Sequence, residues 1–247
     1  MRQTRAMSIH LLGGGDADDE SRWTGRFVAE ARERAEGPPV IVVVLWAADA
    51  SEGEQWHDDY RADLMELGAG EVRIVQLTAE RTLLPIDLGS ADGLFVGGGL
   101  TPGYHAAIMP AADTIRGLVS TGLPYAGYSA GAMIAGDVAL LGGYRIGGIA
   151  VAAEATSEGL DEVTLDAGLG LVDLVVDVHA AQYGTVSRAI AIVAAGLSDR
   201  VVAIDECTSL IVGAGGLEVA GDGSVWTVDK GEAAGDRVTV SVLAAAS

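Results

Sequence analysis

The sequence is almost without two residue types on which several kinds of chemistry depend. Of the 247 residues, one is a cysteine, Cys207, and one is a lysine, Lys230. A single cysteine cannot form an internal disulfide and is typical of a reducing compartment, so we expect a cytoplasmic protein. Schiff-base chemistry and a Walker phosphate loop each need a positioned lysine, and Lys230 stands in a polar stretch near the C-terminus. The composition therefore argues against both functions.

Long apolar runs and basic clusters are also missing. No apolar run approaches the roughly 18 residues of a membrane span. The apolar stretch in the opening MRQTRAMSIHLLGGG is too short for a secretory signal. We expect residues 1–7 to form a flexible N-terminus. With 35 acidic and 15 basic residues the net charge is −20, which argues against nucleic-acid binding. The acidity can attract basic substrates, but a solvated acidic surface is the simpler interpretation.

Apolar runs alternate with helical stretches, which is typical of a mostly parallel sheet covered by helices on both faces. We expect strands at Ile9–Leu12, Val40–Trp46, Val72–Leu77, Gly93–Val96, Pro124–Gly127, Leu174–His179 and Val201–Ile204. We expect helices at about Ser21–Glu36, Gly53–Leu67, His105–Ser120, Ala130–Gly136 and Thr185–Gly196. The short β-rich pieces after Glu206 predict antiparallel strands at Ser209–Val212, Leu217–Val219, Val225–Val228 and Val238–Leu243. The prediction is a single α/β domain over residues 1–247, a three-layer αβα sandwich.

Function in such sheets gathers where the strands end at their carboxyl side. Five features stand at these ends: the glycine runs 13–15 and 97–99, then Ser129, His179 and the pair Asp205-Glu206. A serine, a histidine, an acid and two glycine loops are thus expected on one rim of the sheet.

The stretch "YAGYSAGAM" around Ser129 matches the G-x-S-x-G nucleophile elbow. In that motif small flanking residues allow a sharp strand-to-helix turn that lifts the hydroxyl clear of the sheet. An apolar strand precedes Ser129 and a stretch of small residues follows it, as the motif requires. The other interpretation is a serine that caps a buried helix.

A serine nucleophile needs a base, and His179 ends a predicted strand at the same rim. His105, which follows the second glycine loop, is the competing candidate as base or as substrate contact. For the acid that orients the histidine, Asp205 and Glu206 are adjacent, so their side chains point to opposite faces and only one can serve. Asp177 is a less natural candidate because it precedes His179 by two residues on the same strand. Local chemistry does not choose between Asp205 and Glu206.

The glycine run 97–99 lets backbone N–H groups approach a substrate, and with the N–H of Ala130 it can form an oxyanion hole. Phosphate binding is the competing interpretation of a glycine loop, but acids follow Gly13–Gly15 directly. Neither run matches the dinucleotide pattern G-x-G-x-x-G. No metal-ligand spacing is present, because the acids beside His57 face different directions on a helix. We interpret Cys207, among strand residues, as structural.

These motifs resemble peptidase family S51, the serine peptidases that include aspartyl dipeptidase and cyanophycinase. The resemblance lies in "LFVGGG", "GYSAGAM", "GLGLVDLVVDVH" and "VVAIDECTSLIV", which stand in the family's order over most of residues 9–212. It implies a flavodoxin-like fold similar to class I glutamine amidotransferases. It also implies a triad of Ser129, His179 and Glu206, with Gly98 or Gly99 and Ala130 as oxyanion donors.

The resemblance further implies a cofactor-free hydrolase of small peptides or of aspartyl and β-aspartyl conjugates, and a homodimer. The chain departs from the family where substrate is recognised. Leu100 replaces a polar residue after the glycine loop, and after His179 only Arg188 matches the family's arginines. His105 and Gln182 are candidate substrate contacts. Two alternatives stay open: a small-ligand binding or regulatory protein on the same fold, and a hydrolase of esters or amides without aspartate.

Overall fold

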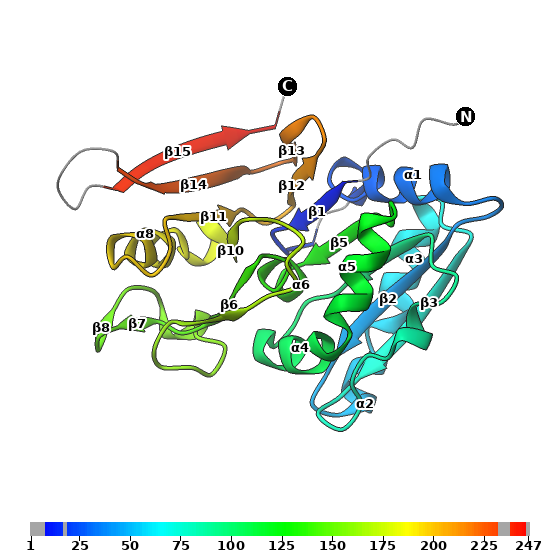
Figure 1. The fold of residues 1–247 in the computed structure, drawn as a ribbon, viewed down its shortest axis with the longest axis horizontal. Coiled ribbons are helices and arrows are strands. Elements are labelled where there is room, and N and C mark those ends of the chain that lie inside the picture. Colours follow the sequence, from blue (N-terminus) through cyan, green and yellow to red (C-terminus); the bar gives the residue numbers. More distant parts are fainter. Residues whose placement is uncertain (1–7, 17–18, 232–237, 246–247) are drawn as a thin grey trace.

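The computed structural model describes residues 8–16, 19–231 and 238–245 (Figure 1). The N-terminus expected to be flexible, residues 1–7, lies outside the described residues. Seven strands form the main sheet, in the spatial order β13 (Gly216–Gly221), β12 (Thr208–Gly213), β1 (Ile9–Leu12), β5 (Tyr125–Tyr128), β4 (Gly93–Val96), β2 (Val40–Trp46) and β3 (Glu71–Leu77). The strands from β1 to β3 in this order are parallel, and β12 and β13 pair antiparallel at one edge.

Both faces of the main sheet are buried, as the continuous apolar strands predict. On β2, Val42 and Val44 belong to one apolar cluster, whereas Ile41, Val43 and Leu45 belong to another. Successive side chains of a strand point to opposite faces, so each cluster marks one face of the sheet. Helices α1 (Gly25–Arg34) and α3 (His57–Glu66) contribute to the second cluster; α4 (Thr101–Ile108), α5 (Ala112–Ser120) and α6 (Ala130–Met133) contribute to the first. The predicted α/β sandwich is confirmed.

Four of the later strands do not join the main sheet but form a second one (Figure 1). Its order is β10 (Val175–Val178), β11 (Arg200–Ile204), β14 (Ser224–Lys230) and β15 (Val238–Ala244). Only β10 and β11 are parallel, and α8 (Val186–Ala194) packs against β11 and β14. The free side of β1 is taken by β12; β10 pairs with β11, and β11 pairs with the C-terminal strand β14. The expectation of one continuous rim through His179 is therefore corrected.

The predicted helices are shorter and more divided than expected. The stretch predicted as one helix over 105–120 is α4, the 3-10 turn η3 (Met109–Ala111) and α5, because Pro110 cannot continue a helical hydrogen-bond ladder. Helix α7 (Ala180–Tyr183) lies outside the helix predicted from Thr185, and Gly184, in a left-handed conformation, separates it from α8. The remaining divided pieces are η1 (Glu20–Arg22) before α1 and α2 (Ala50–Glu54) before α3.

The segment between α6 and β10 has elements that the sequence did not predict. These are β6 (Val138–Gly142), β7 (Arg145–Ile146), β8 (Ile149–Ala150), η4 (Glu154–Thr156) and β9 (Thr164–Ala167). Elsewhere in the chain, the 3-10 turn η2 (Pro85–Leu88) precedes β4. Strands β6 and β9 pair with each other, as do β7 and β8. No helix in the described part of the chain is long and apolar enough to cross a membrane.

Candidate active site

Ser129 stands at the turn between β5 and α6 in a conformation that L-residues rarely adopt. Its φ is 50° and its ψ is −107°, which costs on the order of 1–3 kcal/mol. Its backbone N–H donates to the carbonyl of Leu12 at 2.9 Å. Its own carbonyl accepts from the Met133 N–H in the first turn of α6. The surrounding structure thus holds the strained residue in place, as in a nucleophile elbow.

The glycines on either side of Ser129 are required by close backbone approach. A methyl group at Gly127 would lie 2.4 Å from the backbone of Gly131, and one at Gly131 would lie 2.3 Å from the carbonyl oxygen of Val96. Strand β5, helix α6 and strand β4 therefore meet without room for side chains. The small residues of "GYSAGAM" are what lets α6 begin directly at Ser129.

Ser129, His179 and Glu206 form a continuous hydrogen-bonded chain. The Ser129 Oγ lies 3.0 Å from His179 Nε2, and His179 Nδ1 lies 2.7 Å from Glu206 Oε1. Each of these side chains is part-buried; the His179 ring and the Glu206 carboxylate are 25% and 24% exposed. With Glu206 ionised, Nδ1 carries the proton and donates it to the carboxylate, which leaves Nε2 free to accept from the serine hydroxyl.

The three residues reach one another although they come from two sheets. Ser129 follows β5 of the main sheet, His179 follows β10 of the second sheet, and Glu206 lies where the chain passes from β11 to β12. The loop after β1 joins them. The Gly13 carbonyl accepts from His179 N–H at 3.1 Å, and the Gly14 carbonyl accepts from Cys207 N–H at 2.8 Å.

The glycines of that loop also make room for the histidine and the acid. A methyl at Gly14 would lie 2.2 Å from His179 Cε1, and one at Gly15 would lie 2.6 Å from the Glu206 Cβ. Both glycines have positive φ, 90° and 82°. The first glycine run therefore packs against the back of the candidate triad, a role that the sequence analysis did not find.

The structure separates the three acids between which the sequence left a choice. Asp205 accepts hydrogen bonds from the N–H groups of Ala181 and Ser224 and from the indole of Trp226, at 2.9–3.0 Å. Asp177 forms a fully buried ion pair with Arg188. Glu206 is the one in contact with His179. Two adjacent acids, in the turn that follows β11, thus divide: Asp205 serves the fold and Glu206 contacts the histidine.

Two backbone N–H groups beside Ser129 have no partner among the described residues, those of Gly99 and Ala130. The Gly98 N–H instead donates to the Tyr60 hydroxyl at 3.4 Å, and the Tyr104 hydroxyl donates to the Gly98 carbonyl at 2.9 Å. These tyrosines fix the second glycine run against α3 and α4. The arrangement leaves the Gly99 and Ala130 amides as the available donors for a developing oxyanion.

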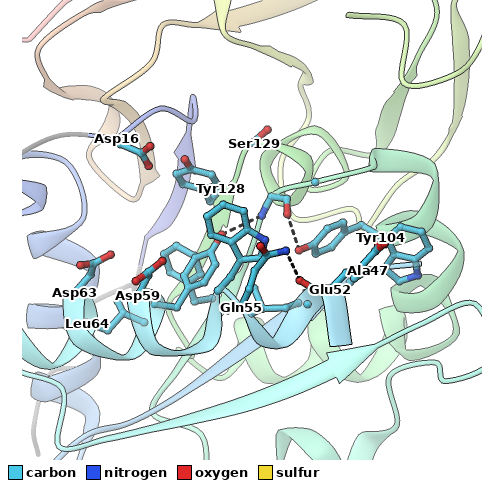
Figure 2. A pocket seen from close by; sticks show the side chains of 18 of the residues that line it. Asp16, Ala47, Glu52, Gln55, Asp59, Asp63, Leu64, Tyr104, Tyr128 and Ser129 are labelled. Atoms are coloured by element: carbon cyan, nitrogen blue, oxygen red, sulfur yellow. Dashed lines mark hydrogen bonds between the residues drawn. The ribbon is translucent and has the colours of Figure 1, made fainter. Parts of the chain in front are cut away.

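Ser129 and Gly99 line two cavities. The larger, of about 870 Å³, is lined by aromatic side chains and by five acids, Asp16, Glu20, Glu52, Asp59 and Asp63. In Figure 2, Asp16, Asp59 and Asp63 lie to one side of Ser129. Burial, followed by repulsion from Asp59, Glu66 and Asp16, raises the pKa of Asp63. The smaller cavity, of about 350 Å³, contains Glu158 and Arg188 beside His179.

Three further residues singled out from the sequence lie apart from the reacting groups. His105 bonds through Nε2 to the Ala167 carbonyl at 2.8 Å and lines neither cavity at Ser129. Gln182 accepts from the Glu206 N–H through its side-chain oxygen, so it supports the acid. Burial and the nearby Glu20 and Glu206 raise the pKa of the Cys207 thiol, which disfavours the thiolate. The placement of His105 speaks against a substrate contact there.

Glu158 is the residue of this region that sequence reasoning missed. It lies in the unpredicted segment before β9, where no periodic pattern marks it, and its φ of 55° is left-handed. Its only sequence signal is the following Gly159 at a turn, which is common in loops. Among the described residues, no three His, Cys, Asp or Glu side chains are grouped as metal ligands.

Two solved structures are similar to this one in fold. The peptidase of an acI-B1 Actinobacterium has a similar crystal structure, with a TM-score of 0.70 at 18% identity over 99% of this chain and 96% of that one. A protein of Listeria monocytogenes EGD-e assigned as a peptidase E gives a TM-score of 0.54 at 16% identity, over 87% of this chain and 98% of that one. These likenesses show the fold. No curated protein sequence matches the chain.

The sequence itself matches the model of one protein family, described as peptidase family S51, over residues 10–219. The matched range includes both glycine runs, Ser129, His179 and Glu206. The resemblance inferred from the motifs is thus confirmed, and the chain belongs to peptidase family S51.

Proposed function

We propose that the protein is a serine hydrolase that cleaves an amide bond in a small peptide or an aspartyl-type conjugate. The observation that carries the proposal is the hydrogen-bonded chain from Ser129 Oγ through His179 to Glu206, at 3.0 and 2.7 Å. A hydroxyl with a neutral imidazole as base, and a carboxylate behind the imidazole, is the arrangement that activates a serine.

In the acylation step the Ser129 oxygen attacks the carbonyl carbon and its proton passes to His179 Nε2. The Gly99 and Ala130 amides stabilise the oxyanion that forms. The carbon–nitrogen bond then breaks, and the proton on Nε2 passes to the leaving amine. Glu206 stabilises the imidazolium while it carries the extra proton.

Deacylation uses the same groups in reverse. A water gives a proton to His179 Nε2 and attacks the acyl ester; the ester bond breaks, and the proton returns to Ser129. The product acid leaves and the free enzyme is restored. Side chains and backbone amides of this chain perform every step, so the proposal names no cofactor.

Ser129→Ala tests the proposal against a panel of Asp-X and β-aspartyl dipeptides together with neutral and basic dipeptides. We expect the variant to lose at least about 10³-fold in kcat, and a fluorophosphonate to label Ser129 in the wild type alone. Ser120→Ala, an exposed serine on α5 that lines neither cavity, is the control. Equal activity of Ser129→Ala and wild type, or labelling elsewhere, contradicts the mechanism.

Hydrolysis of amides that lack an aspartyl group is the second candidate, and a specific observation favours it. The larger cavity at Ser129 is lined by five carboxylates and the smaller one by Glu158, and Arg188 is already paired with Asp177. An aspartyl carboxylate finds no uncommitted guanidinium or ammonium among the described residues that line them. The neutral and basic dipeptides of the panel separate this candidate from the first.

The homodimer expected from the family resemblance is part of the proposal and is tested by light scattering on the purified protein. A single species of twice the chain mass of 25.1 kDa agrees with it, and a species of the chain mass contradicts it.

A further inference from the structure

The larger cavity at Ser129 combines an aromatic wall with acidic side chains. Its volume of about 870 Å³ lies in the range of small-molecule sites and has room for a long side chain. The wall is made of aromatic residues from several elements: Trp46, Trp56, Tyr60, Phe95, Tyr104 and Tyr128. The Trp56 side chain is 55% exposed, and an open apolar surface inside a cavity is typical of ligand contact.

The acids of this cavity have no cationic partners in the described part of the chain. Arg61, on α3, binds Asp58 at 3.0 Å, and Asp58 does not line the cavity. None of the described residues that line it is a lysine, an arginine or a histidine. Four of its five carboxylates accept no hydrogen bond and form no ion pair with a described residue: Asp16, Glu52, Asp59 and Asp63. The negative charge is therefore left for a ligand.

Two of these acids are placed at a cost to the helix that carries them. Asp59 and Asp63 are four residues apart on α3, and their carboxylates lie on the same side of Ser129 as that of Asp16 (Figure 2). Like charges at this spacing destabilise a helix. Burial, followed by repulsion from Asp59, raises the pKa of Asp63. The fold gains nothing from this pair, whereas a bound cation relieves the repulsion.

The position of His179 indicates which half of a substrate faces this cavity. The leaving amine takes its proton from His179 Nε2, so it lies on the His179 side of the scissile carbonyl. His179 lines the smaller cavity but not the larger one. The larger cavity is instead lined by Ser129 and by Gly99, whose amide is an available oxyanion donor. It therefore faces the acyl half of the substrate.

We propose that the larger cavity binds a long cationic side chain, of the arginine or lysine type, on the residue whose carbonyl Ser129 attacks. The inference rests on the proposed role of Ser129 as nucleophile, and it narrows the small peptides to those with a basic acyl residue. The aliphatic stem of such a side chain packs on the aromatic wall. Its charged end interacts with the ring faces and with the carboxylates.

Arginyl and citrullinyl p-nitroanilides test the inference, because citrulline has the length of arginine but a neutral ureido group. Each is used with a free and with an acetylated amino terminus, so that a requirement at the terminus does not decide the result. We expect the wild type to prefer the arginyl substrate at least about 10-fold in kcat/KM. In the double variant Asp59→Asn/Asp63→Asn this ratio falls about 3- to 10-fold.

Asp58→Asn/Glu66→Gln is the matched control, since it removes two charges from the same helix at positions that do not line the cavity. It leaves the ratio unchanged. Thermal unfolding checks the folding of Asp59→Asn/Asp63→Asn, whose Tm should be no lower than that of the wild type because a repulsion is removed. In the wild type the ratio should also fall as NaCl rises from about 0.05 to 0.5 M, since salt screens these half-exposed charges.

Binding to Ser129→Ala provides a measurement that does not depend on turnover. Calorimetry should show that Arg-Ala binds at least about 5-fold more tightly than Cit-Ala, and that Asp59→Asn/Asp63→Asn in the same background reduces this difference. If fluorophosphonate fails to label Ser129 but the difference is seen, the proposed function is overturned and the cation site stands. Absence of the difference overturns the site even where Ser129 is active.

Four kinetic results overturn the inference while leaving Ser129 as nucleophile. Equal cleavage of arginyl and citrullinyl substrates shows that no cation is recognised. A preference that persists in Asp59→Asn/Asp63→Asn and at high salt shows that packing, not charge, selects the substrate. Faster cleavage of aspartyl p-nitroanilide than of the arginyl substrate shows that an anion is bound. A preference seen only between Ala-Arg and Ala-Cit places the cation on the leaving half.

Discussion

At the scale of single residues, the candidate triad depends on Gly14 because this residue has no side chain. The His179 ring occupies the space where a Cβ at position 14 would lie, 2.2 Å from Cε1. The ring must move if any other residue stands there. Its Nε2 is the atom that faces Ser129, so the displacement acts directly on the serine–histidine distance.

Gly14→Ala is therefore expected to lower kcat by at least about 10²-fold, since a shift of about 1 Å in a catalytic group costs that much. The matched control is Gly216→Ala, which also has a positive φ, 104°, but open space around its Cβ. Both variants carry the backbone strain, and only the first meets His179. Steady-state kinetics with Tm measurements separate the two effects, and near-equal kcat for both variants contradicts the assignment.

The neighbouring acids give a second prediction at this scale. Glu206→Gln keeps the size of the side chain but removes the charge that stabilises the His179 imidazolium, so kcat is expected to fall about 10²- to 10⁴-fold. Asp205→Asn removes the same charge one residue earlier, where no contact with His179 exists. Steady-state kinetics, measured below the Tm of both variants, compare the two losses of kcat. A larger loss in Asp205→Asn than in Glu206→Gln would reverse the two roles.

At the scale of elements, the passage from β11 to β12 decides where both acids point. Asp205 accepts hydrogen bonds from the N–H groups of Ala181 in α7 and Ser224 in β14 and from the Trp226 indole. It thereby joins the helix after His179 to the antiparallel part of the second sheet. These three donors commit the buried carboxylate to the fold.

Asp205→Asn is expected to destabilise the fold by about 1–3 kcal/mol, because the amide NH₂ group faces an N–H that needs an acceptor. Urea unfolding at pH 7 measures the free energy of unfolding. Asp229→Asn, at a half-exposed acid on the neighbouring strand β14, is the control and should change it by less than about 1 kcal/mol. Equal stability of Asp205→Asn and wild type contradicts this structural role.

At the scale of the whole molecule, the first strand is fastened to the first helix by Glu30. This acid accepts from the Ser8 N–H and hydroxyl and lies 3.2 Å from His10 Nε2. Burial raises the pKa of Glu30, but the hydrogen bonds from His10 and Ser8 outweigh it and lower the pKa to about 2, from an ordinary value of 4.5.

A lowered pKa in the folded state means that ionised Glu30 stabilises the protein above about pH 4.5, and that this contribution is lost as the pH falls toward 2. Glu30→Gln should therefore lower the free energy of unfolding by about 1–3 kcal/mol at pH 7. The difference from wild type should shrink steadily between pH 4.5 and 2. Urea unfolding across this range checks it, and a difference that grows toward low pH contradicts the sign.

Much of this molecule could be predicted from residues close together in the sequence. The apolar runs predict the parallel strands because both faces of the sheet are buried, and "GYSAGAM" predicts the turn at Ser129 because only small residues permit its close approaches. The family match over residues 10–219 follows from the same local motifs. These features depend on neighbouring residues, which is why the sequence by itself determines them.

Other features depend on which distant segments meet, and only the tertiary structure decided them. β12 lies beside β1, so His179 follows a strand of a second sheet and Glu206 lies where the chain passes between the two sheets. Asp205 and Glu206 are equivalent by local chemistry until the partners of each are in place. Glu158 reaches the site from an unpredicted segment because Gly142 and Thr101, far apart in sequence, position it. Local periodicity carries no information about such contacts, since they are made by packing across elements.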